Sequence, residues 1–110
     1  MAFTKGNTLI STRQIGDRYE VIFDHTGPAS YLSANGDVIN AADIGFGGFE
    51  AMEIGPDTTN TDIALPVMAA AGYGNAVPSV SLQWYTIVGM VVLNSVDLST
   101  ISVRIKATCV

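Results

Sequence analysis

Residues 79–93 (SVSLQWYTIVGMVVL) and residues 101–107 (ISVRIKA) are the two stretches that decide the fold of this chain. In the first, Val80, Leu82 and Trp84 alternate with Ser, Gln and Tyr, which is the two-residue period of a half-buried strand. The second stretch alternates in the same way. The seven residues between them are polar enough to form a turn, so we expect the two strands to pair in one antiparallel sheet.

Two further segments predict strands, and the end of the first stretch has a different pattern. Residues 18–24 alternate clearly and predict a strand, and residues 49–54 predict another. Residues 87–93 form an almost continuous apolar run, which is typical of a strand covered on both faces.

Two segments depart from the strand pattern. Residues 41–45 predict a single helical turn that ends at a glycine. Residues 63–78 contain Pro66 and Gly72, which interrupt regular structure, so we expect an irregular apolar loop with room for one short helix.

These elements predict an all-β fold, a compact antiparallel β-sandwich or small barrel with an N-terminal arm and at most one short helix. Residues 1–16 are expected to form the arm or an edge strand, and residues 17–110 a single β domain. A length of 110 residues is suited to one domain.

The composition is poor in charge. Charged residues make up 14% of the chain and hydrophobic residues 48%, whereas an ordinary globular chain carries about 25% charged residues. Such a deficit indicates either surface that partners cover, because interface centres are depleted of charge, or a small β domain coated with Ser, Thr, Asn and Gly. The net charge of −5 and the scattered cations argue against nucleic acid as a partner.

The chain has one cysteine, Cys109, so neither an intrachain disulfide nor a cysteine-based metal site is expected. Its longest apolar run is far shorter than the roughly 20 residues that span a bilayer, so we expect no membrane partner. The first residues show no basic segment followed by an apolar one, so we expect synthesis in a cytosol-like compartment.

Asp24 and His25 are the only adjacent pair that invites a catalytic interpretation. A triad needs a nucleophile as well, and the nearest hydroxyls, Ser30 and Ser33, are not in a nucleophile-elbow pattern. We expect His25 to be an ordinary histidine at the end of a strand.

Other candidate sites are weaker still. Glu50 and Glu53 would face opposite sides of a strand, which argues against a glycosidase pair. Asp57, Asn60 and Asp62 offer oxygen atoms but lack the spacing of a calcium loop. We therefore expect no catalytic residue, no cofactor and no metal.

Trp84 and Tyr85 could stack against a sugar, which leaves a carbohydrate-binding module as an alternative. A single tryptophan on a strand is more often part of the core, and we favour that interpretation.

Two stretches resemble one known family. Residues 38–56 (VINAADIGFGGFEAMEIGP) and residues 97–107 (DLSTISVRIKA) are similar to segments of small structural proteins of tailed bacteriophages, several of which decorate capsids as cement proteins. The matched positions look like determinants of the fold, and they are Ala41, Ala42, Asp43, Ile44, Gly45, Asp97, Leu98 and Ser99. Asp43 and Asp97 would cap turns through their carboxylates.

The resemblance implies a non-enzymatic virion protein, made in the host cytoplasm and bound to the capsid surface, that stabilises the shell by bridging capsid subunits. Another virion component, such as a head-fibre base or a tail protein, is the alternative. The implied partners are the major capsid protein and further copies of this chain, with a trimer as the first expectation and a dimer as the second. The expected capsid contacts lie on the arm and the 63–78 loop, at Phe3, Lys5, Leu9, Ile10, Arg13, Leu65, Val67, Met68 and Tyr73.

Overall fold

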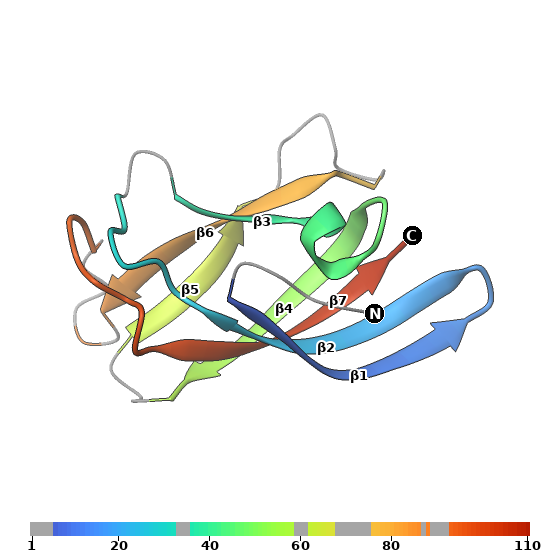
Figure 1. The fold of residues 1–110 in the computed structure, drawn as a ribbon, viewed down its shortest axis with the longest axis horizontal. Coiled ribbons are helices and arrows are strands. Elements are labelled where there is room, and N and C mark those ends of the chain that lie inside the picture. The colour runs from blue at the N-terminus through green and yellow to red at the C-terminus, as the bar shows by residue number, and fades with distance from the viewer. Residues whose placement is uncertain (1–5, 33–35, 59–61, 68–75, 87, 89–92) are drawn as a thin grey trace.

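The structure is a computed structural model that describes residues 6–32, 36–58, 62–67, 76–86, 88 and 93–110. The elements are β1 (Asn7–Ile15), β2 (Arg18–Thr26), β3 (Asp37–Asn40), the 3-10 turn η1 (Ala41–Ile44), β4 (Phe49–Asp57), β5 (Asp62–Val67), β6 (Ser79–Thr86) and β7 (Ser102–Cys109). The strands form two antiparallel sheets, one ordered β1-β2-β7-β4 and one ordered β3-β6-β5 (Figure 1). The all-β, sandwich-like prediction is therefore confirmed.

The core lies between the two sheets, because each sheet turns alternate side chains inward. The four-stranded sheet contributes Val21, Phe23, Val103 and Ile105. The three-stranded sheet contributes Ile39, Ala64, Val80, Leu82 and Trp84. The predicted alternation in residues 79–86 and 101–107 is confirmed, since the expected apolar members are buried, apart from the partly buried Ile101.

The expected pairing of the two C-terminal strands is wrong. β6 is the central strand of the three-stranded sheet, whereas β7 lies between β2 and β4 in the other sheet. The connection crosses from one sheet to the other, and Tyr31 bridges it through Val96. The chain between β6 and β7 runs from residue 87 to residue 101, more than twice the length of the polar turn expected at 94–100. This length allows the chain to cross between the sheets, so that both apolar faces pack into one core.

The expectation of an irregular 63–78 segment is also wrong for its first part, which forms β5. Pro66 is tolerated because β5 is an edge strand, where one side of the strand needs no ladder hydrogen bonds. Residues 68–75, which include Met68, Tyr73 and all but the first residue of the expected short helix (67–71), lie outside the described residues.

The glycine-terminated turn is present. η1 ends at Gly45, which has φ 83° and donates its backbone N–H to the carbonyls of Ala41 and Ala42. A left-handed residue at this position lets the chain reverse into β4, and glycine adopts it without a Cβ clash.

The apolar run that follows β6 is only partly described. Leu93 packs against the core, but Val88 is 88% exposed, so the prediction that both faces of this run are covered is wrong at Val88. Residues 87 and 89–92 lie outside the described part of the chain. No helix in the described segments is long and apolar enough to span a membrane.

Candidate functional sites

Asp24 and His25 are adjacent in β2, yet their side chains leave the sheet on opposite faces. Asp24 is on the outer face, opposite Arg104 of β7, whereas His25 is buried between the sheets. Alternation along the strand produces this separation. The two groups therefore cannot act together on one substrate.

His25 belongs to a buried polar network that joins four strands. Its Nδ1 lies 2.7 Å from Oδ1 of Asn7 in β1, and its Nε2 lies 2.8 Å from Oδ2 of Asp37 in β3. Trp84 in β6 donates its Nε1–H to the same Asp37 oxygen over 3.1 Å. Asp37 Oδ2 is therefore shared by His25 and Trp84, and the tryptophan N–H, which can only donate, donates to it.

The partners of His25 differ from those in a catalytic triad. Both His25 ring nitrogens have side-chain partners, and no hydroxyl or thiol is among them. The sequence pattern missed the network because its members are far apart in the chain. One signal was present, since His25 continues the inward-facing series of Val21 and Phe23.

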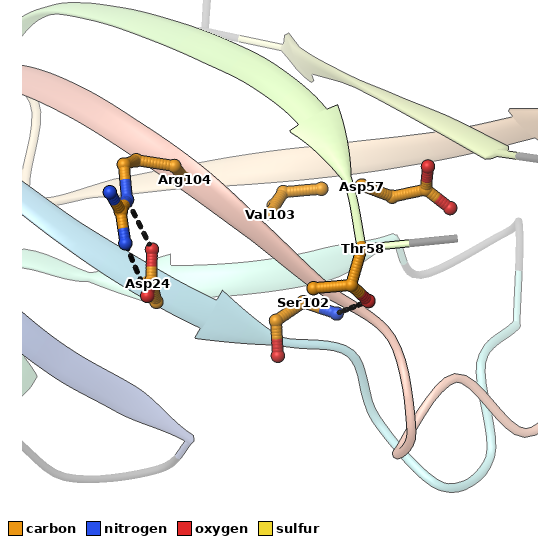
Figure 2. A pocket seen from close by; sticks show the side chains of 6 residues that line it. All are labelled: Asp24, Asp57, Thr58, Ser102, Val103 and Arg104. Carbon is orange, nitrogen blue, oxygen red and sulfur yellow. Dashed lines mark hydrogen bonds and ion pairs between the residues drawn. The ribbon is translucent and has the colours of Figure 1, made fainter. Parts of the chain in front are cut away.

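The four-stranded sheet has a hollow of about 340 Å³, lined by Asp24, Asp57, Thr58, Ser102, Val103 and Arg104. Figure 2 shows these six side chains. Arg104 donates two hydrogen bonds to Asp24, from Nε over 2.8 Å and from an Nη over 3.0 Å. These bonds lower the pKa of Asp24 and raise that of Arg104. Asp24 and Arg104 thus form an ion pair at the hollow.

Asp57, which also lines this hollow, links the end of β4 to the start of β5. Its Oδ2 accepts a hydrogen bond from the backbone N–H of Asp62 over 3.1 Å. Asn60, the third residue of the possible calcium set, is outside the described residues. Within the residues that are described, no group of three or more His, Cys, Asp or Glu side chains is placed to hold a metal ion.

The outer face of the four-stranded sheet is densely charged. Arg13 lies 3.3 Å from Glu20, Lys106 lies 3.7 Å from the same carboxylate, and Arg18 pairs with Glu50. A register shift between Phe49 and Ala51 inserts one residue into β4. Glu50 therefore points to the same outer face as Glu53, which is opposite Lys106, and the expectation of opposite faces is wrong.

The outer face of the three-stranded sheet is different. The strand register and the inward burial of Val80, Leu82 and Trp84 assign its outward side chains. They are Val38, Asn40, Ile63, Leu65, Val67, Ser79, Ser81, Gln83 and Tyr85. None of them is charged. We call this surface the neutral face.

Large apolar side chains on the neutral face are exposed. Leu65 is 41% exposed, Val67 is 51% exposed and Val38 is 50% exposed. Leu65 and Val67 were predicted as contact residues, whereas Val38 was not, because its role depends on its position opposite Ser81. Trp84 is fully buried, so it offers no ring to a sugar.

The contact residues predicted on the arm lie elsewhere. Leu9, Ile10 and Arg13 are on β1, at the far edge of the four-stranded sheet, while β5 packs near β4 at its other edge. Phe3 and Lys5 lie outside the described residues. The structure thus brings together Leu65 and Val67 but separates them from the β1 residues.

The motif residues form two local turns. In η1, the side chains of Ala41 and Ile44 are buried, and the Asp43 carboxylate accepts a hydrogen bond from the Asn40 side-chain amide over 3.3 Å. In the second turn, Leu98 is buried beside Asp97 and Ser99. Asp97 Oδ1 accepts from the Ser99 hydroxyl over 2.6 Å and from its backbone N–H over 2.9 Å, which lowers the Asp97 pKa.

Comparison with known proteins finds no matching family model, no matching curated protein and no matching solved structure.

Proposed function

We propose that this chain is a non-enzymatic structural protein of a bacteriophage virion, a capsid decoration protein that binds the outer surface of the assembled shell. The resemblance of residues 38–56 and 97–107 to phage structural proteins supports this kind of partner. The observation that carries the proposal is the neutral face, which gives the protein a surface suited to docking.

The two outer faces of the molecule differ in what they offer a partner. Burying the charged face would require desolvating Glu20, Lys106, Asp24 and Arg104, whose mutual pairs are exposed and weak. Burying the neutral face removes apolar side chains from water and leaves only hydroxyl and amide groups to satisfy. Depletion of charge at the centre of a surface is the compositional mark of interfaces.

The protein stabilises the shell by mass action. A ligand that binds the assembled lattice but not its separated subunits shifts the equilibrium toward the lattice. Many copies bind one shell, so each contact can be modest. Bridging follows where one bound molecule, or one oligomer, touches more than one capsid subunit.

The test is binding of the purified protein to particles that lack it. Wild-type protein should bind and should raise the temperature at which the particles release their DNA. Leu65→Glu and Val67→Glu should each weaken binding by roughly tenfold or more, because each places a charge at the interface centre.

Val88→Glu is the matched control, since Val88 is highly exposed and is not part of the neutral face. It should bind like the wild type. The proposal is wrong if purified virions contain no such protein, or if electron cryomicroscopy places it only in the tail. Equal binding by the Leu65 and Val88 variants would exclude the neutral face as the docking surface.

A further inference from the structure

The four edge strands of the two sheets are not equally open to pairing. β3 has only four residues, and β5 contains Pro66. β4 has two register shifts and Pro56, and its Phe49 is already bridged to Val77. Short strands, prolines and irregularities all hinder the addition of a further strand.

β1 has few of these obstacles. It is nine residues long, and every residue after Asn7 is exposed. It has one register shift, between Leu9 and Ser11, after which Ser11–Ile15 run in unbroken register with β2. Leu9, Ile10 and Ile15 are among the large apolar side chains that the surface exposes.

The charges on the edge strands also affect where a second copy of the chain can pair. The chain carries a net charge of −5, so two copies that meet through carboxylates repel each other. β4 carries Glu50 and Glu53 on the outer face of its sheet, whereas Asp37 of β3 and Asp57 of β4 are buried and would not meet a second copy. β1 is the one edge strand of the two sheets, as described, that has no acidic residue, and its single charge, Arg13, lies beside Glu20.

We propose that β1 pairs antiparallel with β1 of a second copy about a two-fold axis near Thr12, forming a dimer with one continuous eight-stranded sheet. This register places Thr12 opposite its counterpart, a favourable cross-strand pair of β-branched residues. It also places each Arg13 opposite a Ser11, so the two cations do not face each other. A two-fold axis is the commonest symmetry of homo-oligomers.

The symmetry has a consequence for docking, which rests on the proposed function. A two-fold axis that relates antiparallel strands of one sheet is perpendicular to that sheet. Both neutral faces therefore point to the same side of the dimer. One dimer can then place two neutral faces on one shell, which is the geometry that bridging needs.

The dimer is tested on the purified full chain without any capsid. Sedimentation equilibrium should give twice the 11.5 kDa chain mass. Thr12→Lys should weaken self-association by roughly tenfold or more, because it places two ammonium groups directly opposite each other. Thr100→Lys, a matched change at an exposed threonine outside the strands, should leave it unchanged.

A cross-link tests the axis itself. Opposed residues of an antiparallel pair have Cα atoms about 4.5–5.5 Å apart, within the range for a disulfide. Thr12→Cys should form a disulfide-linked dimer on mild oxidation, and Thr100→Cys should not. The buried Cys109 does not interfere.

The proposal is wrong if the wild-type chain is a monomer. It is also wrong if the chain is a dimer that Thr12→Lys does not weaken and that Thr12→Cys does not cross-link. If the wild-type chain is a monomer and its Thr12→Lys variant no longer binds capsids, β1 pairs with a strand of the capsid protein, and the proposed dimer is again wrong. None of these outcomes tests the neutral face, because Leu65→Glu measures that surface separately.

Discussion

The side chain of Asp37 links the two sheets, because it contacts His25 of β2 and Trp84 of β6. Its buried Oδ2 accepts the Trp84 Nε1–H and lies 2.8 Å from His25 Nε2. Asp37→Ala leaves these two buried nitrogen atoms without their partner, each costing about 1–3 kcal/mol. We expect the free energy of unfolding, measured in urea, to fall by about 3 kcal/mol.

Val38→Ala is the neighbouring control, because the Val38 side chain faces solvent. Its effect should stay within about 0.5 kcal/mol, as for most surface substitutions. Equal effects of the two substitutions would show that the network does not stabilise the fold.

Cys109 should behave as an inert thiol. Burial raises its pKa to about 12, so little thiolate exists at neutral or mildly alkaline pH. At pH 8, Ellman's reagent should react with Cys109 of the native protein only as fast as the protein unfolds. In denaturant it should react with Cys109 at once. Because the unfolded thiol ionises at a lower pH, stability should fall as the pH rises above the unfolded value of about 8.5. Fast labelling of the native protein would contradict this.

The lowered pKa of Asp24 predicts how the free energy of unfolding changes at acidic pH. Its pKa is lowered in the folded state by the Arg104 hydrogen bonds. The stabilisation is therefore fully present above the unfolded aspartate pKa of about 3.9 and is lost as the pH falls through the folded value. Asp24→Asn should lower stability slightly at pH 7 and make no difference at strongly acidic pH, as measured by urea titrations at each pH.

At the level of elements, Gly45 ends η1 in a conformation that other residues adopt with strain. Gly45→Ala should cost about 1–2 kcal/mol, the penalty for a Cβ in the left-handed region. Gly47→Ala is the matched control in the same bend, since an added Cβ there meets only the Val110 carbonyl oxygen at 3.5 Å. Thermal melting of both variants checks the difference.

Local patterns in the sequence predicted several strands, including β2, β6 and β7, but not which strands pair. Val80, Leu82 and Trp84 identify β6 by alternation alone, because burial on one face is a local property. β5 was missed because Pro66 argues against a strand unless it is known to be at an edge. The pairing of β7 with β2 and β4 depends on the whole core, which no single window contains.

The candidate surfaces show the same limit. Leu65 and Val67 could be recognised as exposed apolar residues, but the neutral face also needs Val38 and Ser81, brought beside them by the β3-β6-β5 order. The His25 network needs Asn7, Asp37 and Trp84 from three other strands. Such sites are products of topology, and a pattern within one segment cannot reveal them.

At the level of the whole molecule, the two proposals make a joint prediction about affinity. A dimer that places two neutral faces on one shell binds with avidity, which exceeds single-site affinity by about 10²-fold or more where the geometry allows both contacts. Thr12→Lys should therefore bind shells about 10²-fold more weakly than the wild type, with an unaltered neutral face. Titration of particles with labelled protein measures this, and equal affinities would contradict bivalent binding.

The central place of β7 bears on how the chain folds during its synthesis. β7 follows the six other strands in the sequence, yet it lies between β2 and β4. On the ribosome, β2 and β4 are complete long before residues 102–109 are made, so β2 has only β1 as a partner in its sheet until then and β4 has no partner in that sheet. The β1–β2 hairpin can form early, but the four-stranded sheet closes only afterwards, through contacts of long sequence separation that form slowly. Until β7 is inserted, the nascent chain exposes Val21 and Phe23, which makes that interval the one in which aggregation or chaperone binding competes with folding.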